Sequence, residues 1–106
     1  MVCYQVHLNV RQEIYSDFIS WLETEHIKEV LAQPGFLKAQ LVYKKGGALE
    51  SYSKDIKVIY WLDNEESIKN YLSGPALKLR EKGTDKFPGQ YSAQREVWLE
   101  GSEILK

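Results

Sequence analysis

Two histidines and two arginines are the residues of this sequence best suited to chemistry. An imidazole titrates close to neutral pH and can act as a general base, so His7 and His26 are the candidate catalytic residues. A guanidinium binds a carboxylate through two parallel hydrogen bonds, so Arg80 and Arg95 are candidate anion-binding residues. Together these side chains predict a site for a small acidic molecule.

Each of the four residues also has a structural interpretation. His7 is explained equally well as an interface histidine bonded to Gln or Asn across a sheet. His26 is explained as a cap or a partly buried hydrogen-bond partner at a helix kink. Arg80 and Arg95 are explained as members of structural salt bridges, since alternation places Arg95 among apolar neighbours where its charge needs a partner.

Aromatic and amide side chains extend the set of candidate ligand-binding residues. Trp61 and Trp98 could stack on a flat aromatic substrate, and Gln40 could hydrogen-bond to a ligand beside them. Trp21 has the same aromatic character. Tryptophan is also commonly a core or interface residue, so a packing role remains the alternative for all three.

Several kinds of chemistry are excluded by what the sequence lacks. Two histidines and one cysteine do not make a zinc set, and the acidic pairs 23–25 and 65–66 are typical of solvated helix charges. There is no nucleophile motif, phosphate loop or dinucleotide fingerprint, and no flavin or haem signature. We therefore expect no metal and no cofactor.

Length and composition indicate one globular domain. The 106 residues carry a net charge of −1, with 43% hydrophobic and 27% charged residues. We expect a domain over 1–100 and a tail over 101–106. The charge disfavours nucleic acid, the apolar runs are too short for a membrane helix, and no secretory signal is visible. A single cysteine fits a reducing compartment, so the predicted location is cytoplasmic.

Four segments alternate between apolar and polar residues with the period of two that predicts strands. The predicted strands span 2–10, 36–45, 56–62 and 90–100. In the second, one face carries Leu37, Ala39, Leu41 and Tyr43. Gly46-Gly47 is expected to begin a turn, and residues 48–54 to form the hairpin tip.

Two segments follow helical spacing. In residues 12–32 the apolar stripe rotates by more than a quarter turn, which predicts a kink or two short helices near 24–26. The second helix is expected to begin at Asp63 or Asn64 and to kink or restart at Gly74-Pro75. One of its faces carries Ile68, Tyr71, Leu72 and Leu79, and Gly83 is its expected C-cap.

The order β-α-β-β-α-β predicts an α+β, ferredoxin-like fold, a four-stranded antiparallel sheet with two kinked helices on one face. The other face would carry Gln5, His7, Lys38, Gln40, Val42, Ile59, Trp61, Gln94 and Trp98. Three interpretations compete for it: two subunits pack these faces into a dimeric α/β barrel, the face binds RNA bases, or it is an ordinary solvated sheet. RNA binding is weakened because strand 56–62 has no glycine and little outward aromatic surface.

Two runs of residues resemble a known family. The first comprises Trp21-Leu22, His26-Ile27, Val30-Leu31 and Gly35-Phe36, and the second Tyr71-Leu72, Pro75-Ala76-Leu77, Leu79-Arg80, Phe87-Pro88-Gly89 and Arg95. They resemble an uncharacterised bacterial family, a domain of unknown function, of the dimeric α/β barrel superfamily that contains the antibiotic-biosynthesis-type monooxygenases. The second run is the more specific. Lys28 stands where relatives have a proline, and the His and Asn of haem-degrading members are not matched.

The resemblance implies an architecture and a homodimer that forms through the sheet face, without implying a reaction. Two functions therefore stay open. The first is a small-ligand-binding or structural dimer without enzymatic activity. The alternative is a cofactor-less monooxygenase or isomerase acting on a small, flat, aromatic or acidic molecule, with His7 or His26 as base and Arg95 as anion anchor.

Overall fold

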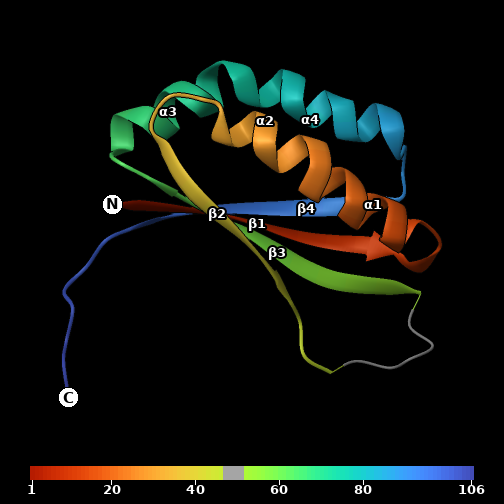
Figure 1. Cartoon of the computed structure of the whole chain (residues 1–106), viewed down its shortest axis with the longest axis horizontal. Helices are drawn as coiled ribbons and strands as arrows, with labels where there is room; N and C mark the ends of the chain where they lie inside the picture. Colours follow the sequence, from red (N-terminus) through yellow and green to blue (C-terminus); the bar gives the residue numbers. More distant parts are fainter. Residues whose placement is uncertain (47–51) are drawn as a thin grey trace.

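A four-stranded antiparallel sheet carries all the helices on one of its faces (Figure 1). The computed structural model describes residues 1–46 and 52–106. In chain order the elements are β1 (Val2–Arg11), α1 (Tyr15–Trp21), α2 (Ile27–Leu31), β2 (Phe36–Tyr43), β3 (Ser53–Leu62), α3 (Glu65–Ser73), α4 (Pro75–Lys86) and β4 (Tyr91–Leu99). The strands lie in the order β2-β3-β1-β4. This confirms the predicted ferredoxin-like topology.

The strand bounds differ from the prediction mainly at β3. This strand begins at Ser53, so residues 53 and 54, which were expected in the hairpin tip, pair with Arg11 and Val10 of β1. Polar residues extend the strand here because the end of β1 supplies hydrogen-bonding partners for them. Gly46 has the positive φ of +90° that suits a turn. Residues 47–51 of the expected turn and tip lie outside the described residues.

The first helical segment changes its winding where a kink was expected. A 3₁₀ turn (Gln12–Ile14) leads into α1, and a π-helical turn (Leu22–His26) joins α1 to α2. In a regular α-helix the eight steps from Leu22 to Val30 would overshoot two full turns by about 80°. The π turn absorbs one extra residue, and both side chains are therefore buried, each 1% exposed.

The second helical segment breaks at the predicted Gly74-Pro75 pair, which leaves Pro75 at the start of α4. Asn64 is the N-cap of α3, because its side chain accepts a hydrogen bond from the Ser67 amide at 3.0 Å. Two expectations were wrong. Leu72 is 40% exposed because it turns away from the sheet, and Gly83 lies inside α4, which continues to Lys86.

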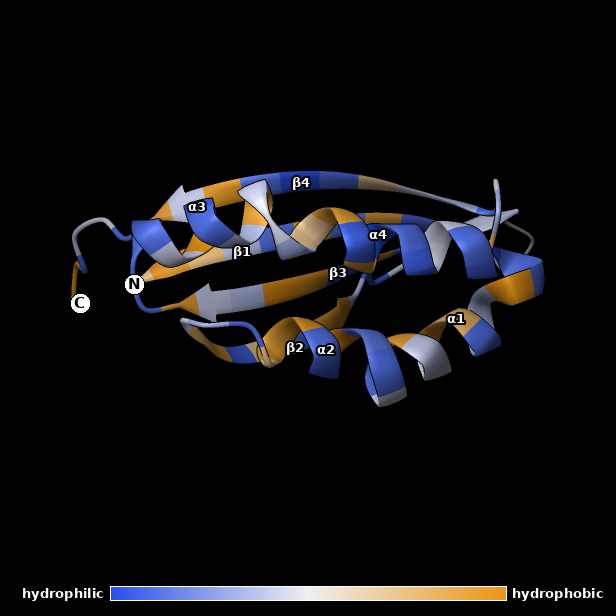
Figure 2. Cartoon of the chain, turned by 90° about the horizontal axis from the view of Figure 1, so that it is seen from above, coloured by the Kyte–Doolittle hydropathy of each residue, from blue (hydrophilic) through white to orange (hydrophobic). Residues whose placement is uncertain are grey.

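An aromatic group forms the centre of the core between the sheet and the helices. The rings of Tyr4 and Tyr60 stack with centroids 5.8 Å apart, and Phe36 meets Tyr71 edge-on at 5.0 Å. Burial raises the pKa of the Tyr60 and Tyr71 hydroxyls, that of Tyr71 to about 12. In Figure 2, α3 and α4 run along the side of β1 and β4, while α1 and α2 run along the side of β2.

Strand register places the residues of the second face as expected. Gln5 is paired with Ile59, Ile59 with Gln40, and His7 with Lys57 and Gln94, so their side chains point away from the helices. Leu37 departs from the prediction, because the register shifts between Phe36 and Lys38 and leaves Leu37 57% exposed. Bulges of this kind redirect a side chain from its expected face.

Candidate functional site

The sheet separates the candidate residues into two groups. Arg95 on β4 is paired with Val6 of β1 and faces the helices, whereas the adjacent His7 of β1 faces the opposite side. His26, Arg80 and Arg95 therefore lie together on the helix side, where all three line one cavity. Gln40, Trp61, Trp98 and His7 lie on the uncovered side. His7 and Arg95 are not brought together, because strand alternation sends neighbouring positions to opposite faces.

The helix-side site consists of an inner cavity and an outer groove. The inner cavity has a volume of about 30 Å³ and is lined by His26, the two arginines and the tyrosines of the core. The outer groove, between α4 and β4, has a volume of about 260 Å³. Arg80, Tyr91 and Arg95 line both spaces, so they form the boundary between them. We call the two spaces together the α4–β4 pocket.

His26 ends the π turn and points into the inner cavity. Its ring stacks on Trp21 with centroids 4.6 Å apart, and its Nδ1 atom is buried without a hydrogen-bond partner. Burial lowers the pKa of His26 from 6.5 to about 4, opposed by the charge of Glu29 and assisted by those of Arg95 and Lys82. The imidazole is therefore neutral near pH 7.

The two arginines have no carboxylate partner among the described residues. Arg80 donates a 3.4 Å hydrogen bond from Nη2 to the Tyr4 hydroxyl, while its Nε is buried without a partner. Arg95 makes no hydrogen bond or ion pair within residues 1–46 and 52–106. The structural salt bridges considered for these residues are thus not found there. The pocket carries two cations and an unsatisfied imidazole nitrogen.

Sequence reasoning missed the tyrosines of this pocket. Tyr4, Tyr71 and Tyr91 line the inner cavity and supply hydroxyls beside the arginines. The alternating pattern placed Tyr4 on the apolar face of the first strand, and Tyr91 on the same face of the last strand as Arg95. This shared face could have predicted that the tyrosines lie near Arg95, since cross-strand neighbours on one face of a sheet lie close together.

The uncovered face carries a row of three residues across neighbouring strands. Cys3 of β1 is paired with Trp61 of β3 and with Trp98 of β4, and the three line a depression of about 170 Å³. The ammonium of Lys38 lies 4.7 Å from the ring centroid of Trp61. Trp98 is 54% exposed. We call Cys3, Trp61 and Trp98 the tryptophan row.

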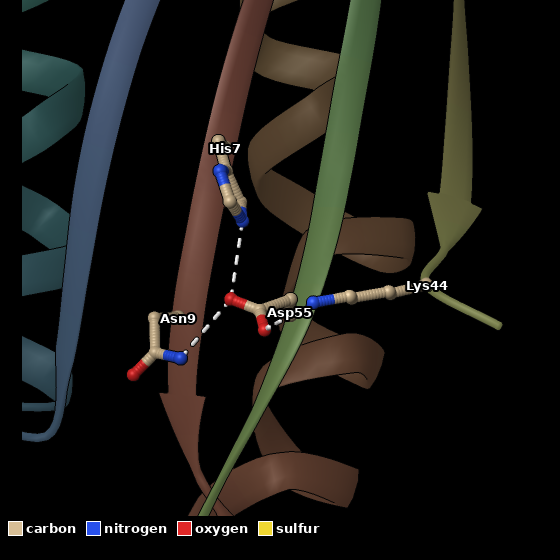
Figure 3. Close-up of polar contacts among 4 residues, drawn as sticks. All are labelled: His7, Asn9, Lys44 and Asp55. Carbon is tan, nitrogen blue, oxygen red and sulfur yellow. Dashed lines mark hydrogen bonds and ion pairs between the residues drawn. The ribbon is translucent and has the colours of Figure 1, made fainter. Parts of the chain in front are cut away.

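His7 has a different partner from those considered in the sequence. Its Nε2 lies 3.1 Å from Oδ1 of Asp55, which stands on the neighbouring strand β3 (Figure 3). The expected Gln or Asn partner is thus replaced by a carboxylate. The two residues are far apart in the chain, and the pairing depends on the register of β1 with β3, which the sequence pattern does not fix to a single residue.

Two further observations bear on the kind of protein this is. Across the described residues, no three His, Cys, Asp or Glu side chains are grouped as metal ligands. None of the described helices combines the length and apolar character that a bilayer crossing requires.

Solved structures with the same fold differ widely from this chain in sequence. The haem degrader MhuD from Mycobacterium tuberculosis, solved with two haems in its active site, has a TM-score of 0.72 at 18% identity, covering 98% of this chain and 99% of that one. A proposed antibiotic biosynthesis monooxygenase from Deinococcus radiodurans has a TM-score of 0.69 at 15% identity, covering 100% and 98%. A dimeric ferredoxin-like protein from an uncultured marine organism has a TM-score of 0.67 at 13% identity, covering 100% of both chains. These similarities show the fold.

The sequence comparisons assign the chain to a family. No curated protein matches the sequence. Residues 1–101 match the model of a family described as a domain of unknown function, DUF4286. The match spans both helical segments and all four strands, including the residues whose pattern resembled such a family. The chain therefore belongs to this family of unknown function, and its fold is that of the antibiotic-biosynthesis-monooxygenase-like, dimeric ferredoxin-like proteins.

Proposed function

We propose that this protein is a cytoplasmic homodimer whose α4–β4 pocket binds a small acidic molecule with a flat apolar body. The observation that carries the proposal is the pair of arginines without a carboxylate partner among the described residues. Arg80 is partly buried and Arg95 is exposed, and a guanidinium in either setting binds a carboxylate through charge-assisted hydrogen bonds. A ligand carboxylate between Arg80 and Arg95 would supply that acceptor.

The dimensions of the pocket limit its ligand. The outer groove of about 260 Å³ suits a single ring or a short chain, whereas the inner cavity of about 30 Å³ suits one small polar group or a water molecule. The carboxylate would lie at the boundary between the two spaces. A polar group beyond it would reach the unpaired Nδ1 of His26.

Haem does not fit this pocket. The cavity that His26 faces is about 30 Å³, far below the roughly 300 Å³ at which pockets for drug-sized ligands begin, and a porphyrin is larger still. The inner cavity therefore has no room for a haem beside His26.

Binding is favoured over catalysis by the state of His26. A general base works best with a pKa near the operating pH, and the pKa of His26 is lowered to about 4. The imidazole therefore suits hydrogen-bond acceptance better than proton abstraction. The alternative of a cofactor-less monooxygenase or isomerase has in its favour the neutral, unpaired nitrogen beside an anion site, and product formation from a bound acid would establish it.

The dimer contact is assigned to the uncovered face of the sheet. Trp98 is exposed on the edge strand, and the tryptophan row forms an apolar patch at one end of this face that a second copy would cover. The ferredoxin-like protein from the uncultured marine organism is dimeric, which supports a dimer for this chain.

Ligand binding is tested by tryptophan fluorescence. Trp61→Phe/Trp98→Phe leaves Trp21, which stacks on His26, as the only tryptophan, and this variant is titrated with benzoate, other aromatic acids and uncharged quinols. We expect the aromatic acids to change the Trp21 fluorescence saturably and the uncharged quinols to leave it unchanged. Arg95→Gln should weaken binding about tenfold or more, as the loss of a charged hydrogen bond does, whereas Lys38→Gln on the opposite face should not. The proposal would be refuted if no acid changed the Trp21 fluorescence. It would also be refuted if Arg95→Gln bound the acids as tightly as the protein that keeps Arg95.

A further inference from the structure

A second polar cluster lies on the other side of the sheet from the α4–β4 pocket. Its centre is the carboxylate of Asp55, whose Oδ1 is 3.1 Å from both His7 Nε2 and Asn9 Nδ2 (Figure 3). The ammonium of Lys44 lies 3.9 Å from the other oxygen, Oδ2. The hydrogen bond from Asn9, joined by that from His7, holds the pKa of Asp55 below its usual value despite partial burial.

The ionised carboxylate fixes the tautomer of His7. A carboxylate only accepts hydrogen bonds, so Nε2 of His7 must donate to it. The neutral ring then carries no proton on Nδ1, which becomes an acceptor. Because Asp55 is itself held by Asn9 and Lys44, the orientation of the imidazole is determined by three neighbours. A histidine held in this way is the usual arrangement of a ligand-binding or proton-accepting imidazole.

The cluster borders a groove of about 340 Å³. The groove is lined by His7, Val42, Lys44, Asp55, Ile56 and Lys57, among others. Its volume falls within the range of small-molecule sites, which begin at roughly 300 Å³. It lies apart from the tryptophan row, because His7 is four residues along β1 from Cys3, or about 13 Å. Both lie on the uncovered face, so a second copy that covered the whole face would enclose the groove between two chains.

The charges of the groove leave one cation unmatched. Asp55 offsets Lys44, whereas Lys57 has no carboxylate partner within the described residues. Lys44, Lys57 and Asp55 together give the groove one net positive charge beside the apolar side chain of Val42. A monoanion is the ligand that this combination of charge and surface would attract.

We propose that this groove is a second ligand site, specific for a small monoanion that also carries a hydroxyl group, such as a hydroxycarboxylate. The carboxylate contacts the Lys57 ammonium, and the hydroxyl donates to Nδ1 of His7. Asp55 is a positioning residue, because it holds His7 in the tautomer that accepts this hydrogen bond. The residues named here all belong to one chain, and the proposal does not depend on the function proposed for the α4–β4 pocket.

The test uses ¹⁵N NMR of the imidazole nitrogens, since the sequence contains two histidines and each reports on one face of the sheet. The probes are 3-hydroxybutyrate and butyrate, which differ in the hydroxyl alone. We expect 3-hydroxybutyrate to shift Nδ1 of His7 saturably and to bind more tightly than butyrate. Lys57→Gln should lower the affinity for 3-hydroxybutyrate about tenfold, as the loss of a charge-assisted contact does.

Matched variants separate the roles of the residues. Lys38→Gln removes another lysine of the same face, and Arg95→Gln alters the α4–β4 pocket, and neither should change the His7 response. Asp55→Asn should abolish the preference for 3-hydroxybutyrate over butyrate while both anions still bind, because the amide no longer enforces one tautomer.

Three results would overturn the proposal: an unchanged His7 resonance, equal affinity for the two probes, or binding that survives Lys57→Gln. A His7 resonance that responds to neither probe but varies with protein concentration would identify a second copy as the occupant of the groove. This result also overturns the proposal. The Trp21 titration remains independent of all these results, so failure of one site does not count against the other.

Discussion

His26 combines a buried ring with nearby cations, and both oppose its protonation. The ring is held over Trp21 by the π turn, and Arg95 and Lys82 add positive charge around it. In the unfolded chain the same imidazole is solvated and titrates near 6.5. The residue therefore links the stability of the fold to pH.

Acid should destabilise the protein through His26. Because the pKa of the folded state lies below that of the unfolded state, the neutral form is favoured by folding, and this contribution is complete above pH 6.5. It is lost as the pH falls from 6.5 towards 4, by at most about 3 kcal/mol. Urea unfolding at several pH values, compared between the wild type and His26→Phe, isolates this loss.

The Phe variant keeps an aromatic ring on Trp21 but cannot take up a proton. Its free energy of unfolding should fall less steeply over the same pH interval. His7→Gln serves as the control, because it removes the other histidine without touching the pocket. Parallel curves for the wild type and His26→Phe would show that His26 titrates alike in the folded and unfolded states.

At the residue scale, the sequence pattern selects candidate side chains but does not give their partners. His26 was found from the phase change of the helix stripe, a local signal. Strand alternation gives the side of the sheet that Arg95 faces once the register is known. It does not predict that Arg95 has no salt bridge within the described residues. That absence depends on where the acidic residues of other elements lie, as when Glu29 pairs with Lys82 at 2.7 Å.

At the scale of elements, α4 approaches the body of the protein at a glycine. A Cβ atom on Gly83 would lie 2.5 Å from the Tyr91 hydroxyl and 2.9 Å from Cη2 of Trp21. The side-chain-free position lets α4 pass close to both rings. The sequence suggested a C-cap here because glycine at the end of a helical pattern is usually a terminator. Contact with β4 and α1 is a tertiary requirement that leaves no trace in the local sequence.

Gly83→Ala should destabilise the fold by about 1–3 kcal/mol, the usual effect of overpacking. This loss would exceed the gain of up to about 1 kcal/mol that alanine brings in a helix interior. Thermal unfolding monitored by circular dichroism measures it, with the exposed neighbour Thr84→Ala as control. A variant as stable as the wild type would mean that α4 can move outward at no cost.

At the scale of the whole molecule, the sheet has one covered and one open face. The order of elements and the alternation of four segments predicted this arrangement from sequence, because both depend on short-range patterns. The start of β3 and the bulge at Leu37 were missed, since each depends on pairing with another strand. Prediction thus reached the topology and the two faces of the sheet, but not the residue-by-residue pairing at the start of β3 and at Leu37.

Introducing a charge into the tryptophan row should separate the subunits of the proposed dimer. Trp98→Glu places a carboxylate in the tryptophan row, where its desolvation on association is unfavourable. Sedimentation equilibrium should then give 12.3 kDa, against twice that mass for the wild type. Leu77→Glu alters a side chain of α4 that is 63% exposed, and it should leave the larger mass unchanged. A wild type that sediments at 12.3 kDa would remove the dimer.

The edge strand β4 serves both faces of the sheet. Arg95 points from it into the α4–β4 pocket, and Trp98, three residues further on, points to the opposite side. An acid held by Arg95 and a subunit resting on Trp98 would thus restrain one short backbone segment. If ligand binding changes the association constant of the subunits by some factor, association must change the affinity for the ligand by the same factor. This follows because the coupling between two equilibria is reciprocal.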